Sequence, residues 1–247
     1  MIAVDFDLDF VEKYVETDNG RIHYLHHAGH DESIIFVHGF GANARTWKRL
    51  AGFLPGGLDV YLVDLLGHGK SDAPRIRYTV TLQSEAIDRL IEAEKIRGYY
   101  IFGHSYGGWV AAFHAQGSRE KAGLILEDSA GLKEFIEERE KEHGYKERMF
   151  REAMLLNPRD YVVRSTIESF RNSEELTRES LSTISEPSLV LWGEDDRLID
   201  IRYGRLLSEY IPGSDFETVN GGGHTPHYLM PEFVSGRLSS FLERNRD

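Results

Sequence analysis

A serine lies between two glycines in a Gly-x-Ser-x-Gly motif that spans residues 103–107. Glycines at these two positions remove side chains that would clash in a sharp turn, so Ser105 can stand exposed there. A serine hydroxyl is a poor nucleophile at neutral pH and needs a neighbouring base to take its proton. The motif therefore makes Ser105 a candidate nucleophile, provided that a base with a supporting acid lies beside it.

The C-terminal part of the chain offers a base and an acid of this kind. His224 follows three consecutive glycines, residues 221–223, in a loop directly after the last predicted strand. Such a loop can bring an imidazole close to a serine without steric obstruction. Asp196 lies at the end of the preceding predicted strand and can orient that imidazole. Ser105, His224 and Asp196 are therefore the candidate nucleophile, base and acid.

Three other acidic residues compete with Asp196 for the role of the acid. Asp195 and Glu194 precede it directly, and Asp128 follows another predicted strand. Asp195 has two further interpretations, because it could cap the turn or pair with Arg197. The residue types alone leave this choice open.

Predicted strands and helices alternate along most of the chain. A hairpin comes first, at residues 11–27, with Asn-Gly in its turn. After the hairpin, the alternation is typical of a parallel sheet with helices on both faces. The strands that short apolar runs predict cover residues 33–38, 58–64, 99–102, 123–127, 188–192 and 215–219.

The predicted helices follow from apolar residues at helical spacing. Residues 44–54 form one such segment, and Thr79 or Thr81 can cap a second helix. Pro231 opens the last helix. Ser105 lies directly before an alanine-rich helix, and the N-terminus of that helix favours developing negative charge.

Residues 132–186 interrupt the alternation. This segment has no strand signal, many charges and scattered large apolar residues. The apolar residues argue against a flexible linker. We interpret the segment as a helical insertion packed over one end of the sheet. The predicted domains are therefore a core of residues 1–131 and 187–247 and a helical cap of residues 132–186.

Four motifs follow one another along the chain: His38-Gly-Phe-Gly, Asp64-x-x-Gly-x-Gly-x-Ser71, Gly103-His-Ser-Tyr-Gly107, and Gly193-x-x-Asp196 with Gly223-His224. In this order they resemble the α/β-hydrolase superfamily, and specifically its small esterase and meta-cleavage-hydrolase-like branch. The resemblance extends over nearly the whole chain. It implies an α/β fold with an eight-stranded, mostly parallel sheet flanked by helices, and an insertion that caps the active site.

The resemblance also implies roles for single residues. The family spacing Gly-x-x-Asp selects Asp196 as the acid. In this fold one oxyanion donor follows an early parallel strand, and the other is the residue after the nucleophile. The backbone N–H groups of Phe40 and Tyr106 are therefore expected to bind the oxygen of a tetrahedral intermediate.

Several histidines lie near these motifs. We interpret His38 and His104 as structural hydrogen-bonding residues rather than catalysts, and His227 as either a pocket-lining or a surface residue. A metal site at the end of the hairpin is a weaker interpretation than a solvated loop, because no supporting residues are visible around its four candidate ligands. These candidates are His26, His27, His30 and Asp31.

The resemblance implies hydrolysis of carboxylic esters with small to medium acyl chains through an acyl-enzyme intermediate. Haloalkane dehalogenases and epoxide hydrolases are disfavoured, because they use an aspartate where this chain has Ser105. Carbon–carbon bond hydrolases usually have a tryptophan after the catalytic histidine, whereas Thr225 follows His224 here. Hydrolysis of another bond (carbon–carbon, lactone or amide) and a low-turnover ligand receptor remain the alternatives.

The composition of the chain limits the kinds of molecule that it is expected to bind. The formal net charge of −12 argues against nucleic acid and against anionic membrane surfaces. The absence of cysteine rules out disulfides, thiolate zinc sites and a cysteine nucleophile. The N-terminus does not resemble a signal peptide, and no stretch approaches the roughly 18 apolar residues of a membrane span. We expect a cytoplasmic protein that acts on a small-molecule ester without a metal or organic cofactor, and the sequence contains no signal for an oligomeric state.

Overall fold

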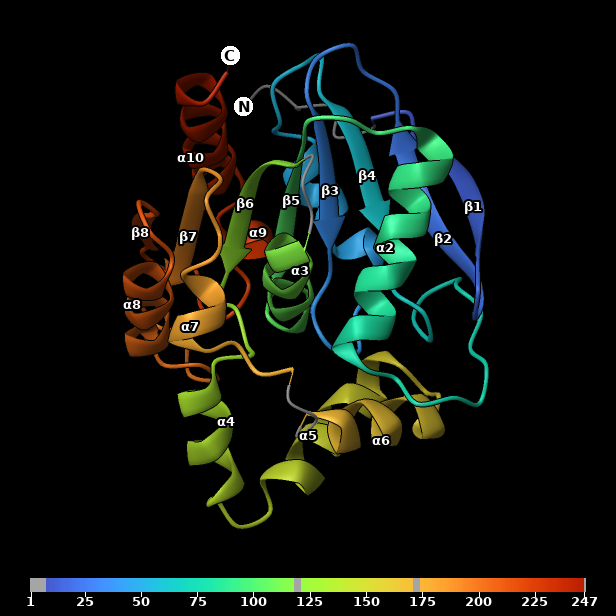
Figure 1. Cartoon of the computed structure of the whole chain (residues 1–247), viewed down its shortest axis with the longest axis vertical. Helices are drawn as coiled ribbons and strands as arrows, with labels where there is room; N and C mark the ends of the chain where they lie inside the picture. Colours follow the sequence, from blue (N-terminus) through green and yellow to red (C-terminus); the bar gives the residue numbers. More distant parts are fainter. Residues whose placement is uncertain (1–7, 118–120, 171–173, 247) are drawn as a thin grey trace.

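The computed structural model describes residues 8–117, 121–170 and 174–246. Eight strands form one sheet in the order β1-β2-β4-β3-β5-β6-β7-β8 (Figure 1). The pairs β1–β2 and β2–β4 are antiparallel, and all other neighbours are parallel. The strands are β1 (Val11–Thr17), β2 (Gly20–His27), β3 (Ser33–Val37), β4 (Asp59–Val63), β5 (Tyr99–His104), β6 (Lys121–Glu127), β7 (Ser188–Gly193) and β8 (Asp215–Val219). The expectation of an eight-stranded, mostly parallel sheet is confirmed.

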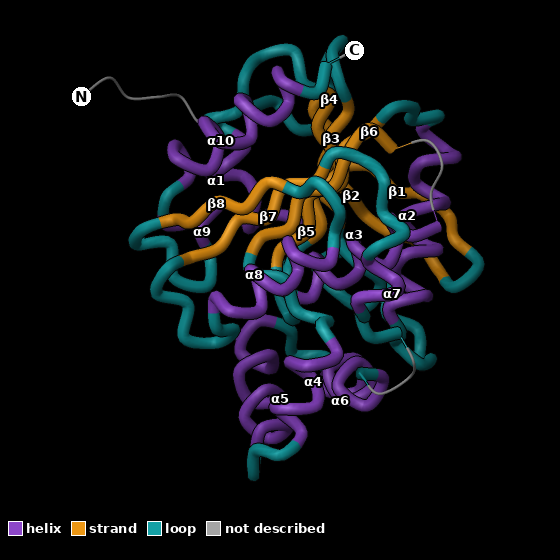
Figure 2. The backbone as a smooth tube through the Cα atoms, turned by 60° about the vertical axis from the view of Figure 1, so that its left-hand side comes forward, coloured by secondary structure: helices purple, strands orange, loops and turns teal. Residues whose placement is uncertain are grey.

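Helices cover both faces of the sheet (Figures 1 and 2). On one face lie α2 (Val80–Glu94), α3 (Tyr106–Gly117), α7 (Arg178–Leu181) and α8 (Ile201–Tyr210). On the other face lie the 3₁₀ helix η1 (Ala44–Trp47), α1 (Lys48–Ala51), α9 (Pro226–Leu229) and α10 (Pro231–Arg244). The remaining helices are α4 (Lys133–Glu140), α5 (Tyr145–Leu156) and α6 (Asp160–Ser169).

The central strands are buried on both sides, and their alternating residues face two different cores. In β3, Ile35 and Val37 belong to the core beneath α2, α3 and α8, whereas Ile34 and Phe36 belong to the core beneath η1, α1 and α10. Because side chains alternate along a strand, one short apolar run serves both cores. This arrangement holds β5, which precedes Ser105, rigidly in the middle of the sheet.

The helix predicted at residues 44–54 is wrong in detail, because the segment divides into η1 and the short α1. The backbone N–H of Ala44 donates to the buried Asp64 carboxylate at 2.6 Å, so a tertiary contact ties down the first turn. The prediction for α2 is confirmed at its start, where the Thr79 hydroxyl accepts a hydrogen bond from Leu82 N at 3.1 Å.

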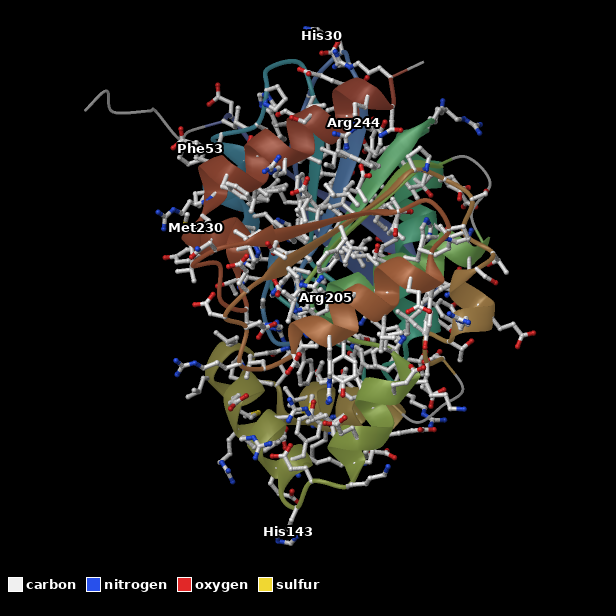
Figure 3. All side chains as sticks on the ribbon, turned by 90° about the vertical axis from the view of Figure 1, so that its left-hand side faces the viewer. His30, Phe53, His143, Arg205, Met230 and Arg244 are labelled. Atoms are coloured by element: carbon white, nitrogen blue, oxygen red, sulfur yellow. The ribbon has the colours of Figure 1, made fainter. Side chains whose placement is uncertain are left out.

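Helices α4, α5 and α6 lie together below the ends toward which the parallel strands point (Figure 1). A small separate core joins Ala153 of α5 and Val163 of α6, and Phe40 packs against it, whereas Phe135 of α4 packs in the main core beneath α2, α3 and α8. In Figure 3 the labelled His143, between α4 and α5, marks the tip of this helical group, at the opposite end of the molecule from His30. The predicted division into a core and a cap at residues 132–186 stays a prediction.

Candidate active site

Ser105 lies between β5 and α3 in a left-handed backbone conformation, with φ of +51°. Its N–H donates to the carbonyl of Glu127 at 2.9 Å, and its carbonyl accepts from Ala130 N at 3.0 Å. The glycines of the motif are required at this turn. A Cβ on Gly103 would lie 2.2 Å from the Gly107 carbonyl oxygen. The sequence motif thus predicts the observed sharp turn correctly.

The structure brings the three predicted residues together. The distance from Ser105 Oγ to His224 Nε2 is 3.1 Å, and the distance from His224 Nδ1 to Asp196 Oδ2 is 2.7 Å. The Asp196 side chain is fully buried, and its other oxygen accepts from the backbone N–H groups of Leu198 and Ile199. The carboxylate is therefore positioned to accept from Nδ1–H, which leaves Nε2 free to take the serine proton.

The three competing acids have other partners. Asp195 accepts a hydrogen bond from Gly223 N at 2.9 Å, and Glu194 accepts one from the Thr218 hydroxyl at 2.7 Å. Asp128 accepts one from the N–H of Gly193 at 3.0 Å, and one of its oxygens lies within 4.8 Å of an oxygen of Asp196. Among the four candidates, only Asp196 makes a hydrogen bond to His224 within the described residues.

Phe40 and Tyr106 lie on the two segments that border Ser105. A Cβ added to Gly39 would lie 3.3 Å from Ser105 Cβ, so the loop that carries Phe40 passes close to the serine. Within the described chain, the backbone N–H groups of Phe40 and Tyr106 donate to no protein acceptor. Two free donors beside a candidate nucleophile suit the role predicted for them, which stays a prediction.

A cavity of about 790 Å³ opens onto Ser105 and His224. The sheet side contributes Phe40 and Trp109, so Trp109 lines the cavity as well as packing in the core. Much of the remaining apolar wall comes from α4, α5 and the end of α6, and part of it from Leu198 and Ile199 after β7. The helical residues are Phe135, Ile136, Met149, Ala153, Leu156, Ile167 and Phe170. The site therefore presents a nucleophile at the edge of a mostly apolar chamber.

The motif that begins at Asp64 supports the loop of residues 38–44. The Asp64 carboxylate accepts from the N–H groups of Ala44 (2.6 Å) and Lys70 (2.8 Å), and it bonds to the ring of His23 (2.8 Å). Because buried carboxylates need such partners, this motif is a structural anchor for the loop.

A buried polar cluster lies beneath His224. His104 is buried, and its Nε2–H donates to the carbonyl of His224 at 2.6 Å. Burial first, and neighbouring histidines second, lower the pKa of His104 well below its usual value, so the ring is neutral. The backbone N–H of His227 donates to one carboxylate oxygen of Glu127, and its ring Nδ1 bonds to the other. The hypothesis that His104 is a hydrogen-bonding residue fits these contacts.

The structure corrects the interpretation of His227, and it shows that Glu127 is a further residue that supports the candidate site. His227 is neither at the surface nor in the cavity wall, because it is fully buried and its ring lies 4.3 Å from the ring of Trp47. His104, Glu127 and His227 bring potential metal ligands together, but both Glu127 oxygens already accept hydrogen bonds from His227. Glu127 has no motif of its own, and only its place at a strand end could have drawn attention to it.

The hairpin histidines do not assemble a ligand set. His26 Nε2 bonds to Asp59 at 2.8 Å and its ring stacks on Tyr61, while His27 Nδ1 approaches the carbonyl of Asp9 at 3.3 Å. Within the described residues, the groups of three potential ligands lie elsewhere. None of the helices in the described ranges combines the length and hydropathy of a membrane span.

Comparison with known proteins assigns the family. The model of the alpha/beta hydrolase family matches residues 34–237, and the chain belongs to this family. A putative 2-succinyl-6-hydroxy-2,4-cyclohexadiene-1-carboxylate synthase of Bacillus subtilis is 26% identical over 85% of this chain and 90% of its own length. A 2-hydroxy-6-oxononadienedioate/2-hydroxy-6-oxononatrienedioate hydrolase of Paraburkholderia phymatum is 23% identical over 93% of this chain and 95% of its own.

Solved structures agree on the fold. A crystal structure of a membrane phospholipase A has a TM-score of 0.82 and 25% identity, over 96% of this chain and 87% of that one. An esterase from Exiguobacterium antarcticum has a TM-score of 0.79 and 19% identity, over 94% of this chain and 100% of that one. The protein is thus a member of a hydrolase family whose structural neighbours include esterases.

Proposed function

We propose that this protein is a serine hydrolase that cleaves carboxylic esters of small to medium acyl chains. One observation carries the proposal: Ser105 Oγ, the imidazole of His224 and the Asp196 carboxylate form a continuous chain of contacts, 3.1 Å and 2.7 Å long, at the edge of an apolar cavity. This arrangement suits transfer of the serine proton to the imidazole during attack on a carbonyl.

The proposed reaction has two halves. His224 Nε2 takes the Ser105 proton as Oγ forms a bond to the ester carbonyl carbon, and Asp196 stabilises the imidazolium that results. The imidazolium then gives its proton to the alcohol as the carbon–oxygen bond breaks, which leaves an acyl group on Ser105. Water repeats the sequence through His224 and releases the acid.

The carbonyl oxygen becomes negative in both halves. In the proposed mechanism the N–H groups of Phe40 and Tyr106 donate to this oxygen, since they have no protein acceptor within the described chain. The N-terminus of α3, at Tyr106, adds its dipole. Removal of one such donor typically costs about 3 kcal/mol of transition-state stabilisation.

We also propose that residues 132–186 act as a cap that encloses the acyl chain. Helices α4, α5 and α6 line the cavity with apolar side chains, among them Phe135, Met149 and Ile167, and α4 and α5 also contribute charged ones. The three helices lie over the end of the sheet that carries Ser105. A volume of about 790 Å³ is within the usual range for small-molecule sites.

The test is a panel of p-nitrophenyl esters of increasing acyl length, measured beside a fluorophosphonate that labels an activated serine. Ser105→Ala should reduce kcat by about 10⁶-fold, because the nucleophile is lost. Ser182→Ala is the matched control, since Ser182 is exposed and is not among the residues that line the cavity. Circular dichroism should be the same for all three proteins.

The outcomes separate the proposal from its alternatives. Sustained turnover of several acyl lengths, lost in Ser105→Ala, supports the esterase. Equal turnover by Ser105→Ala would refute the serine mechanism. A burst of one nitrophenol per enzyme without turnover supports a ligand receptor, and labelling without any ester cleavage supports a hydrolase of another bond.

A further inference from the structure

Asp128 is a buried carboxyl group that the proposed mechanism does not use. It follows Glu127 at the end of β6 and is fully buried. Its φ of +44° lies in the left-handed region, which residues with side chains seldom adopt, so the surrounding structure must hold it there. Its N–H donates to Leu191 O at 3.1 Å, and its Oδ1 accepts from Gly193 N at 3.0 Å.

The other oxygen of Asp128 has no N–H or hydroxyl partner. Oδ2 is inaccessible to solvent and accepts no hydrogen bond. An oxygen of Asp128, an oxygen of Asp196 and a ring nitrogen of His224 lie within 4.8 Å of one another. A buried carboxylate without partners is costly, whereas a carboxylic acid can donate its proton to a second carboxylate.

The charges around Asp128 favour this neutral form. Glu127, on the same strand, and Asp196, on the loop after β7, are both acidic, and the Gly193 N–H is the opposing donor. Burial first, and these two acids second, raise the pKa of Asp128 well above its usual value. In its protonated form, Asp128 can donate its O–H to Asp196, an oxygen of which lies within 4.8 Å.

We propose that Asp128 is a second acid of this site: its O–H donates to the Asp196 carboxylate, and its own carboxylate supports His224 when Asp196 is lost. The proposal rests on the proposed serine mechanism. In the native protein the O–H restrains the orientation of Asp196 and so acts through it on His224. When residue 196 carries no charge, Asp128 can release its proton to water and accept from His224 Nδ1–H instead. Asp128 is thus a positioning residue.

The experiment measures the rate at which a fluorophosphonate labels Ser105 in four proteins: wild type, Asp196→Asn, Asp128→Asn and the double variant. Labelling reports the activation of the serine without any assumption about the natural substrate. Loss of the triad acid typically costs about 10⁴-fold. We expect the double variant to reach this loss, and Asp196→Asn to remain at least about tenfold faster than the double variant because Asp128 replaces the acid.

A pH profile distinguishes this role from a merely structural one. In Asp196→Asn the labelling rate should rise with pH, and this rise should occur at higher pH than the rise in the wild type. The reason is that Asp128 must first ionise beside Glu127 and His224. The double variant should lack this rise. Glu194→Gln is the control, since Glu194 is exposed and, within the described chain, its side chain bonds only to Thr218; it should label at the wild-type rate.

Equal labelling rates and equal pH profiles for Asp196→Asn and the double variant would overturn the inference. So would a loss in Asp128→Asn as large as that in Asp196→Asn, because the two residues would then act only as one unit. If Asp128→Asn fails to fold, the pH profile of Asp196→Asn decides alone, and a profile without the rise at higher pH refutes the inference. If wild type is not labelled, the proposed serine mechanism fails, which is a separate result.

Discussion

Two consecutive carboxyl groups at the end of β6 support different parts of the candidate site. Glu127 binds His227, three residues after the candidate base, and Asp128 binds the N–H of Gly193, three residues before the candidate acid. The backbone between them also contacts the nucleophile, because Ser105 N donates to the Glu127 carbonyl. One strand end thus fixes all three loops relative to one another.

Glu127→Gln tests this support at the level of one residue. Both Glu127 and His227 are fully buried, so removal of the charge leaves a buried polar group with a poorer partner. We expect a loss of about 3 kcal/mol in the free energy of unfolding. We also expect kcat for an ester to fall more than KM changes, because His224 loses its fixed position.

Urea denaturation measures the first effect, and Glu209→Gln is the matched control. Glu209 pairs with Arg178 at the surface, where both side chains are more than half exposed. An exposed pair of this kind contributes at most about 1 kcal/mol. Similar losses in the two variants would show that the buried pair has no special role.

At the level of elements, the turn between β5 and α3 and the end of α6 meet at the wall of the cavity. The ring of Phe170, directly after α6, lies 5.9 Å from the ring of Tyr106 and 6.0 Å from that of Phe40. Aromatic side chains from two separate parts of the chain therefore meet beside the predicted oxyanion donors. In the proposed function, their packing limits how far a bound acyl chain can extend.

Phe170→Ala should change which acyl lengths are preferred. Removal of the ring enlarges the cavity, so the ratio of kcat/KM for a ten-carbon ester to that for a four-carbon ester should rise by about tenfold, the effect of roughly one methylene contact. Phe233→Ala removes an exposed phenylalanine from α10 and should leave the ratio unchanged. A ratio that stays constant in both variants would show that Phe170 does not limit the acyl chain.

The sequence predicts elements and motifs whose signals are local. The Gly-x-Ser-x-Gly motif places Ser105 at a strand-to-helix turn, and the glycines before His224 mark its loop, so both can be read from adjacent residues. The surroundings of His227 depend on Trp47 and Glu127, which are distant in the sequence. No local pattern reports such contacts, and this is why the burial of His227 and the partnership of Glu127 were not predicted.

At the level of the whole molecule, several histidines are buried in a neutral form. Burial lowers the pKa values of His38 and His104, and it lowers the pKa of His68 to about 3. Each of these rings makes a hydrogen bond to a backbone carbonyl. His38 Nε2 also accepts from Leu65 N, which connects the loops after β3 and β4, and His104 connects β5 to the loop after β8 that carries His224.

These buried rings make the stability of the fold depend on pH. The unfolded chain binds a proton at His68 once the pH falls below about 6.5, whereas the native protein binds it only near pH 3. The stabilisation from this group is therefore complete above pH 6.5 and is lost as the pH falls, by about 1.4 kcal/mol per pH unit. Between pH 6.5 and pH 5 the loss should be about 2 kcal/mol.

His68→Gln isolates this contribution, because an amide donor can replace Nδ1–H in the bond to the Leu66 carbonyl without titrating. The difference in the free energy of unfolding between pH 7 and pH 5, from urea denaturation, should be smaller in the variant by about 2 kcal/mol. His143→Gln, which removes an exposed histidine between α4 and α5, should retain the wild-type difference. An unchanged difference in His68→Gln would mean that the ring of His68 takes up its proton in the native protein as readily as in the unfolded chain.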